Sequence, residues 1–321
     1  MKRIVFALGI LLICSLHAAE EQPHRPHIYG IASVRVLVTS IPEAQDFYSK
    51  LISKDHPCIW CGQPSRNTLS VNEVQFVQLA KSAAMPSNRI DEITFATDDV
   101  PALRRYFAAH NIPTISPTFS DLDDSPILRQ EMPAVKRPPD APKEPDVFLT
   151  VRDPEGHRTG FVQLPPDVLA AFSQRQSMRL IHAGFIVQAR TLEDSFYNDI
   201  LGFHLYWHGG MKDDETNWVS MQVPDGTDWL EYMLNVSPDA SKHTVGVMNH
   251  IAIGVSDIET ENFAVRKNGI AVHEEPKIGR DGKWQLNLYD PDDTRVEFME
   301  FTPTQKPCCS EYTGPHPGQH P

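Results

Sequence analysis

The segment LIHAGFIVQARTLEDSFYNDILGF, residues 180–203, decides the fold of this chain. It starts as an alternating, largely apolar strand and continues, after a polar turn, as a helix with one apolar face. Residues 28–52, IYGIASVRVLVTSIPEAQDFYSKLI, repeat this order, with a turn at Ile41 and Pro42 before the helix. A strand and a helix that recur in the same order indicate an internally repeated architecture.

Shorter copies occupy residues 91–112 and 249–270, and each consists of a strand, an acidic turn, a helix and the start of another strand. Extended, alternating segments follow all four copies, for example KWQLNLYD at 283–290 and TRVEFMEF at 294–301. The sequence therefore predicts an α+β fold built from four similar units. Its 321 residues suffice for two domains of ordinary size.

Two histidines and two glutamates occupy matching places in the second half of the chain. His182 and His250 each open the first strand of a unit, whereas Glu231 and Glu297 each lie in a last strand. One such residue alone is more often structural or solvated than a ligand, but burying all four without an ion costs on the order of several kcal/mol. Two imidazoles and two carboxylates suit a borderline divalent ion such as Zn, Ni, Co, Mn or Fe(II). The sequence thus predicts one divalent metal ion held by these four ligands.

The phrases that contain the four residues resemble those of one family. They are RLIHAGF, DWLEYMLN, MNHIAIGVSDIE and YDPDDTRVEFMEF. They resemble the vicinal-oxygen-chelate superfamily, which includes glyoxalase I, bleomycin- and fosfomycin-resistance proteins, extradiol dioxygenases and methylmalonyl-CoA epimerases. The resemblance covers about residues 28–303 and implies two tandem domains, 28–166 and 178–303, joined by a short helix. Each domain is expected to pair two βαβββ modules into a curled sheet around a cleft.

The order His, Glu, His, Glu is most similar to the glyoxalase I pattern. That resemblance implies a metal-dependent lyase or isomerase that moves a proton on a small oxygen-bearing substrate. Glu297 is then the catalytic base, Glu231 is its counterpart and a fellow ligand, and Asn235 is a substrate-binding residue. Where the family commonly has an arginine for the glutathione carboxylate, this chain has Ile186, so the substrate stays open.

Two other functions fit the same phrases. An extradiol dioxygenase would use His182, His250 and Glu297 as its facial triad for Fe(II), in the second of two paired-module domains. That class places an acid–base histidine shortly before its last-strand motif, yet residues 278–290 contain none. A non-catalytic small-molecule binding protein is the third hypothesis, and the complete ligand set argues against it.

The first half of the chain lacks this ligand set. Its corresponding positions hold Ser33, Glu92 and Gly160, with Gln78 as the fourth. Only the Glu92 carboxylate binds metals well, and one carboxylate does not hold a transition ion against water. We therefore expect no catalytic metal in the first domain, which would serve a structural role or cover the neighbouring site.

The N-terminus and the charge bear on location and partners. Residues 1–19 combine a basic start, an apolar run too short for a permanent anchor, and small residues, and so predict a cleaved export signal. The expected location is periplasmic or secreted, and a lipoprotein attached through Cys14 is the alternative. The formal net charge of −13 is spread along the chain, which disfavours nucleic-acid or anionic-membrane partners and favours a small-molecule substrate. Sequence leaves the oligomeric state open.

Four further cysteines, Cys58, Cys61, Cys308 and Cys309, form an even set that predicts disulfides in an exported chain. Connectivity cannot be read from sequence; we expect the tail, residues 304–321, to be tied back to the first module. Local bridges, reduced thiols and a zinc site are the alternatives. A proline-rich stretch between residues 112 and 147 is expected to form a surface insertion or a flap.

Overall fold

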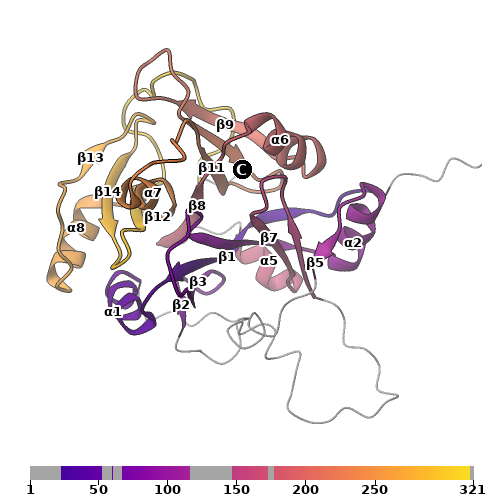
Figure 1. The fold of residues 1–321 in the computed structure, drawn as a ribbon, viewed down its shortest axis with the longest axis horizontal. Coiled ribbons are helices and arrows are strands. Elements are labelled where there is room, and N and C mark those ends of the chain that lie inside the picture. The colour runs from indigo at the N-terminus through magenta and orange to yellow at the C-terminus, as the bar shows by residue number, and fades with distance from the viewer. Residues whose placement is uncertain (1–22, 53–59, 61–66, 116–146, 173–176, 319–321) are drawn as a thin grey trace, which may run out of the picture.

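The computed structural model describes residues 23–52, 60, 67–115, 147–172 and 177–318. These residues form two mixed sheets with helices, one after the other along the chain (Figure 1). The expected export signal, Cys58, Cys61 and most of the proline-rich stretch lie outside the described residues. Within the described ranges, no helix combines the length and the apolar character needed to cross a membrane.

The first sheet has the strand order β2-β3-β1-β4-β7-β6-β5. Its central strands pair at the middle of the sheet: β1 runs antiparallel to β4, β1 runs parallel to β3, and β4 runs parallel to β7. Two strand-and-helix units are therefore joined through their first strands. The elements are β1 (Ile28–Val38), α1 (Ile41–Leu51), β2 (Thr68–Ser70), β3 (Phe76–Lys81), β4 (Ile90–Thr97), α2 (Val100–Ala109), β5 (Thr114–Ile115), β6 (Phe148–Arg152) and β7 (Arg158–Gln163).

The second sheet repeats this plan with the order β13-β14-β15-β12-β8-β11-β10-β9. Again the two first strands, β8 and β12, are antiparallel neighbours, and each is flanked by the parallel last strand of its own unit, β11 or β15. The predicted α+β fold of two tandem, two-module sheets around a cleft is thereby confirmed. The elements are β8 (Met178–Ile186), α6 (Arg190–Asp194), the π-helix η1 (Ser195–Ile200), β9 (His204–Gly209), β10 (Trp218–Gln222), β11 (Trp229–Met233), α7 (Lys242–Met248), β12 (His250–Val255), α8 (Ile258–Lys267), β13 (Lys277–Ile278), β14 (Trp284–Tyr289) and β15 (Arg295–Glu300).

The acidic turns of the two shorter repeats are helix caps. The Asp99 side chain accepts a hydrogen bond from Ala102 N at the start of α2 (2.7 Å), and Asp257 accepts one from Thr260 N at the start of α8 (2.7 Å). Each cap satisfies a backbone N–H that the first turn of a helix leaves unpaired. The linking segment contains the expected short helix, α5 (Pro166–Phe172).

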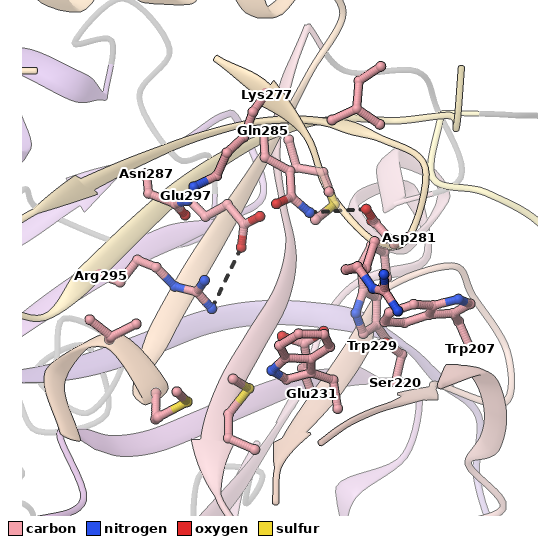
Figure 2. A pocket seen from close by; sticks show the side chains of 18 of the residues that line it. Trp207, Ser220, Trp229, Glu231, Lys277, Asp281, Gln285, Asn287, Arg295 and Glu297 are labelled. Atoms are coloured by element: carbon pink, nitrogen blue, oxygen red, sulfur yellow. Dashed lines mark hydrogen bonds and ion pairs between the residues drawn. The ribbon is translucent and has the colours of Figure 1, made fainter. Parts of the chain in front are cut away.

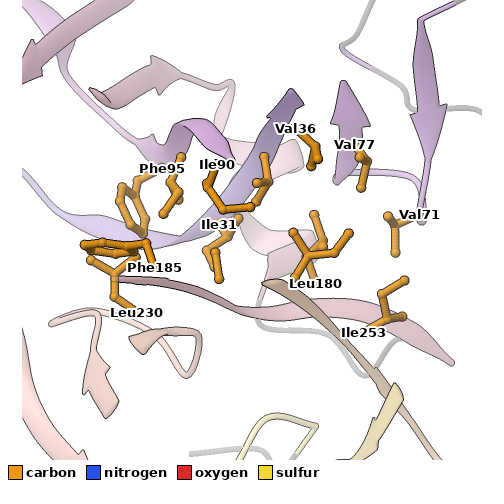
Figure 3. Close-up of a cluster of buried hydrophobic side chains, with 14 of the residues drawn as sticks. Ile31, Val36, Val71, Val77, Ile90, Phe95, Leu180, Phe185, Leu230 and Ile253 are labelled. Atoms are coloured by element: carbon orange, nitrogen blue, oxygen red, sulfur yellow. The ribbon is translucent and has the colours of Figure 1, made fainter. Parts of the chain in front are cut away.

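The main hydrophobic core lies between the two sheets, to which both contribute side chains. Figure 3 shows Ile31 and Phe95 of the first sheet near Leu180 and Phe185 of the second. Each side chain of this size contributes roughly 1.5–3 kcal/mol when it is fully buried. A separate cluster of aromatic side chains in the second sheet surrounds Tyr206, Trp207 and Trp229. The shared core occupies one face of the second sheet. The opposite face of that sheet is therefore available for a site.

A buried ion pair also joins the sheets. Arg179 on β8 donates from Nε to Asp228 Oδ1 (2.8 Å) and from Nη2 to Asp228 Oδ2 (3.0 Å). Asp228 Oδ2 additionally accepts from Ile31 N of β1 (2.9 Å), so the carboxylate spans both domains. Nearby, Gln75 Nε2 donates to the carbonyl oxygens of Ile31 (2.7 Å) and Leu180 (2.9 Å). The two first strands, β1 and β8, are thereby fixed relative to each other.

The C-terminal tail departs from one expectation. Cys308 and Cys309 are joined to each other by a disulfide, so the predicted bridge between the tail and the first module is wrong. Hydrogen bonds hold the tail along β9 instead: Thr313 N donates to Tyr206 O (3.0 Å), and His208 N donates to Ser310 Oγ (2.9 Å). Because the tail packs on the second sheet, its adjacent cysteines pair locally.

Candidate metal centre

The four predicted ligand residues come from four adjacent strands of the second sheet. Along the sheet order β15-β12-β8-β11 they are Glu297, His250, His182 and Glu231. The parallel pairing of β8 with β11 and of β12 with β15 brings the last strand of each unit next to its first strand. The repeat thus explains why two His on first strands meet two Glu on last strands.

One glycine makes room for this arrangement. Gly184 lies opposite His250 in the β8–β12 pairing, and a Cβ at Gly184 would lie 2.6 Å from His250 Nε2 and nearer still to its Cε1 and Nδ1. The His250 ring therefore fills the space that any side chain at residue 184 would need. The corresponding residue of the first half is Arg35. The repeat therefore shows that glycine replaces arginine at this position, and the structure shows that the glycine leaves room for the His250 ring.

The donor atoms of the four side chains lie near the two imidazole Nε2 atoms. His182 Nε2 lies 3.0 Å from His250 Nε2, and Glu231 Oε2 lies 3.1 Å from His250 Nε2 and 4.0 Å from His182 Nε2. Glu297 Oε2 is 3.7 Å from His182 Nε2 and 3.9 Å from His250 Nε2. Ligands about 2.1 Å from one ion are separated by about 3.0 Å at right angles and about 4.2 Å when opposite. All five distances fall in that range, and His182, Glu231 and His250 offer ligand atoms that lie within 4.8 Å of one another. These three residues fit a divalent ion, and Glu297, beside both imidazoles, is the candidate fourth ligand.

Burial favours the neutral form of the two imidazoles. Both rings are fully buried, and the loss of solvation lowers the pKa of His182 and that of His250 well below the usual value. His182 stacks on Trp229 with ring centroids 4.7 Å apart, and His250 Nδ1 lies 3.4 Å from the carbonyl oxygen of Met248. A hydrogen bond from Nδ1 to a backbone carbonyl leaves Nε2 as the lone-pair donor that a metal requires.

Buried charges surround the four ligands. Desolvation raises the pKa of Glu297 to about 8, an effect that the nearby Arg295 guanidinium opposes. Burial also lowers the pKa of Lys283 to about 8, while the pKa of Asp281 rises to about 6 for the same reason. The Lys283 ammonium sits among aromatic rings, 4.6 Å from the Trp229 centroid and 5.3 Å from that of Tyr312. Buried ionisable groups and aromatic rings thus lie together around the candidate ligands.

A cavity of about 420 Å³ opens beside Glu231 and Glu297 (Figure 2). Arg295 points into it from β15, two residues before Glu297 and on the same face of the strand. Its Nη2 lies 3.9 Å from Glu297 Oε2, and its Nε is buried without a hydrogen-bond partner. The tail covers one side of the cavity, where Tyr312 OH donates to Asp281 O (2.8 Å).

Sequence reasoning did not single out Arg295, Lys283 or Tyr312. Of these three residues, only Arg295 could have been found from sequence, because residues two apart in a strand face the same side of the sheet and Arg295 precedes Glu297 by two. Asn235, the expected substrate-binding residue, does not line the cavity. It lies after β11 with a left-handed backbone (φ 60°), and its Nδ2 donates to Thr216 O (2.9 Å), so its amide holds a turn.

The matching positions of the first sheet are used differently. Glu92 Oε2 accepts a hydrogen bond from Arg158 Nε (2.8 Å) and lies 3.9 Å from Arg35 Nη2. Desolvation nevertheless raises the pKa of Glu92. A Cβ at Gly160 would meet Glu92 Oε1 at 2.8 Å, so the backbone packs directly on this carboxylate. Ser33 on β1 and Gln78 on β3 are neutral, buried side chains.

Known proteins share this sequence pattern and fold. Residues 185–298 match the family described as the Glyoxalase/Bleomycin resistance protein/Dioxygenase superfamily. A lactoylglutathione lyase of Haemophilus influenzae is 28% identical over 130 residues, which span 40% of this chain and 96% of that protein. The alignment leaves more than half of this chain unmatched.

Solved structures match across both sheets. Homoprotocatechuate 2,3-dioxygenase from Brevibacterium fuscum, in complex with 3,4-dihydroxyphenylacetate, is 17% identical with a TM-score of 0.52, and the match covers 93% of this chain and 86% of that chain. The 2,3-dioxygenase LapB from Pseudomonas sp. KL28 is 14% identical with a TM-score of 0.50, covering 91% and 93%. These likenesses concern the fold. The family match thus concerns residues 185–298, and the solved structures show that the fold of both sheets is shared with these dioxygenases.

Proposed function

We propose that the chain is a metal-dependent enzyme that moves a proton between adjacent carbons of a small oxygen-bearing substrate, as a glyoxalase-like lyase or isomerase. The observation that carries the proposal is the position of Glu231, whose Oε2 lies 3.1 Å from His250 Nε2 within the ligand cluster. A site of two imidazoles and two carboxylates matches the glyoxalase pattern rather than a three-residue triad. A divalent ion bound there would polarise the substrate oxygens and stabilise negative charge on them.

The chain's own residues divide the remaining work. His182 and His250 are neutral, buried and oriented, and therefore serve to hold the ion. Glu231 and Glu297 come from the two outer strands of the four and approach the centre from opposite sides. Both carboxylates line the cavity. Either can therefore take a proton from a substrate carbon, and the other can return it to the adjacent carbon.

Arg295 supports a substrate with an anionic oxygen. Its guanidinium faces the cavity and pairs with Glu297 only at 3.9 Å, which is too long for a hydrogen bond. An arginine whose donors are not used by the protein is suited to a carboxylate or phosphate group. The cavity of about 420 Å³ admits a small molecule of this type.

An Fe(II) extradiol dioxygenase is the second candidate, because the structural likeness to two 2,3-dioxygenases covers more than nine-tenths of this chain, including both sheets. The triad His182, His250 and Glu297 is contained in the present cluster. No histidine is found among the described residues that line the cavity, so the usual acid–base group of that class has no counterpart there. A non-catalytic binding role is the third alternative.

Hydrogen–deuterium exchange tests the proposal. Metal-loaded protein is incubated in D2O with small α-hydroxycarbonyl compounds that carry a carboxylate, and the exchange at carbon is followed by NMR. We expect exchange that Glu297→Gln abolishes and that proceeds without oxygen uptake. Oxygen consumption with catechols, in iron-loaded protein that shows no exchange, would favour the dioxygenase instead. Ligand binding without either reaction would favour the binding protein.

A further inference from the structure

A second cluster of ionisable side chains lies where the two domains meet. The turn between β6 and β7, residues 153–157, packs against the start of α6 in the other domain. Glu155 accepts hydrogen bonds from Gln188 N with Oε1 (2.8 Å) and Oε2 (3.1 Å), and Glu193 Oε1 in turn accepts from Glu155 N (2.9 Å). This turn and this helix are therefore interlocked.

The same interface occurs twice, because the chain is repeated. The turn between β14 and β15 packs on α1 in an equivalent way, where Asp292 Oδ2 accepts from Thr39 N (2.7 Å). Tyr48 OH donates there to Asp290 Oδ2 (3.2 Å), just as Tyr197 OH donates to Asp153 Oδ2 (3.1 Å) at the first interface. Both interfaces thus share a hydrogen bond from a tyrosine on the helix to an aspartate in the turn.

Two of the differences between the interfaces concern ionisable residues with no counterpart at the other interface. Aligning IPEAQDFY with RTLEDSFY places Glu193 opposite Ala44, and aligning DPEGHR with DPDDTR places His157 opposite Thr294. The interface at Asp290 therefore forms without a second carboxylate and without an imidazole. Glu193 and His157 are therefore not part of the contacts that the two interfaces share.

These two residues create a potential ligand set. Asp153, His157 and Glu193 offer ligand atoms that all lie within 4.8 Å of one another, and His157 Nδ1 is 2.8 Å from Asp153 Oδ2. The Asp153 side chain and Glu193 are fully buried, whereas the His157 side chain is 14% exposed. Glu193 Oε2 is buried and has no hydrogen-bond partner. Burial and the nearby Asp153 carboxylate raise the pKa of Glu193 to about 9, so in the absence of a cation this carboxyl is protonated at neutral pH, and a bound cation would favour its charged form.

We propose that Asp153, His157 and Glu193 bind a divalent cation between the two domains. Two carboxylates and one imidazole suit ions of the Zn²⁺ or Mn²⁺ class, with water in the remaining positions. The ring of His157 rests on Phe185 of β8, with centroids 4.6 Å apart, and the partly exposed imidazole provides the route of entry. Since Glu193 belongs to the second domain and the other two ligands to the first, binding of the ion would tie the domains together.

The test uses the full chain carrying His182→Ala and His250→Ala, so that the central metal centre does not contribute. The protein is stripped with a chelator, kept without reductant so that Cys308 and Cys309 stay joined, and titrated with Zn²⁺ by calorimetry. We expect one ion per chain and a rise in melting temperature on binding. Adding Glu193→Ala, which copies Ala44, should weaken binding by more than about tenfold and remove the rise in melting temperature.

Glu193→Gln provides a second variant with a side chain of unchanged size. If the alanine variant does not fold, the Zn²⁺ affinity of this variant is compared with that of the parent protein. Absence of Zn²⁺ binding in the parent protein would overturn the proposal, and the two carboxyl groups would then share a proton. Binding that survives both Glu193 variants would also overturn it. The outcome is independent of the central site, because that site has been removed in every sample.

Discussion

Replacing Gly184 with alanine tests whether His250 is a metal ligand, because the new methyl group occupies the space of its ring. The added Cβ would lie 2.6 Å from His250 Nε2, well inside van der Waals contact, so the imidazole must move. Overpacking of this kind costs about 1–3 kcal/mol of folding stability. Displacing a ligand, rather than deleting it, is expected to weaken metal binding about 10- to 100-fold, which corresponds to about 1.4–2.7 kcal/mol.

Gly254→Ala is the matched control. Gly254 lies on the same strand, β12, and its added Cβ would meet only apolar groups, lying 2.6 Å from Ile181 Cγ2 and close to the Phe301 ring. Both variants should lose several degrees of melting temperature, at about 2–4 °C per kcal/mol for a domain of this size. Only Gly184→Ala should also lose Co²⁺ affinity, measured by absorbance in competition with a chelator. Equal affinity losses in the two variants, or none in Gly184→Ala, would refute the role given to His250.

Three other predictions concern stability and the tail. Asp228→Asn should lower the urea-measured free energy of unfolding by about 3–5 kcal/mol, since it leaves Arg179 buried without its partner; a loss under 1 kcal/mol would contradict this. Burial raises the pKa of Asp290 to about 6, so the folded state retains a proton that the unfolded state releases above about pH 4. The stabilisation from this group, up to about 3 kcal/mol, should be full below pH 4 and disappear as pH rises through 6. The measurement is the difference in free energy of unfolding between wild type and Asp290→Asn as a function of pH. A difference that does not change with pH would contradict the prediction. Non-reducing peptide mapping should recover Cys308 joined to Cys309, and a peptide linking either cysteine to the first module would contradict the structure.

Much of the fold could be predicted because the chain repeats itself. The hydrophobic alternation of residues 28–38 and 178–186 and the acidic caps Asp99 and Asp257 each encode a local element. Copies of the same element then indicate the same pairing. The disulfide could not be predicted, because spacing does not fix connectivity and the tail's place on β9 depends on tertiary contacts.

The candidate site was predictable only where a repeat carried it. His182, Glu231, His250 and Glu297 occupy equivalent positions of two units, so parallel pairing of first and last strands brings them together. Lys283 gave no such signal, because its aromatic surroundings come from β9, β11 and the tail. The cluster at the domain interface gave no sequence signal, because Glu193 follows Asp153 by 40 residues and the two meet only after the domains pack.

The Asn235 prediction shows the limit of a family pattern. The residue follows Glu231 by four positions, as the resemblance requires, but a left-handed turn directs its amide to Thr216. A motif can therefore be complete in sequence while the backbone directs one member away from the cavity. In the proposed function, the residue that binds the anionic group of the substrate is Arg295, whose guanidinium faces the cavity.

The central claim is that His182, Glu231, His250 and Glu297 hold one divalent ion, and metal content measures it most directly. Elemental analysis would be carried out on Glu193→Ala protein, in which the site between the domains is disabled. We predict one ion per chain, unchanged by Ser33→Ala at the matching position of the first sheet and falling below about a tenth in the His182→Ala, His250→Ala double variant. A full complement of metal that survives the double variant would contradict the claim.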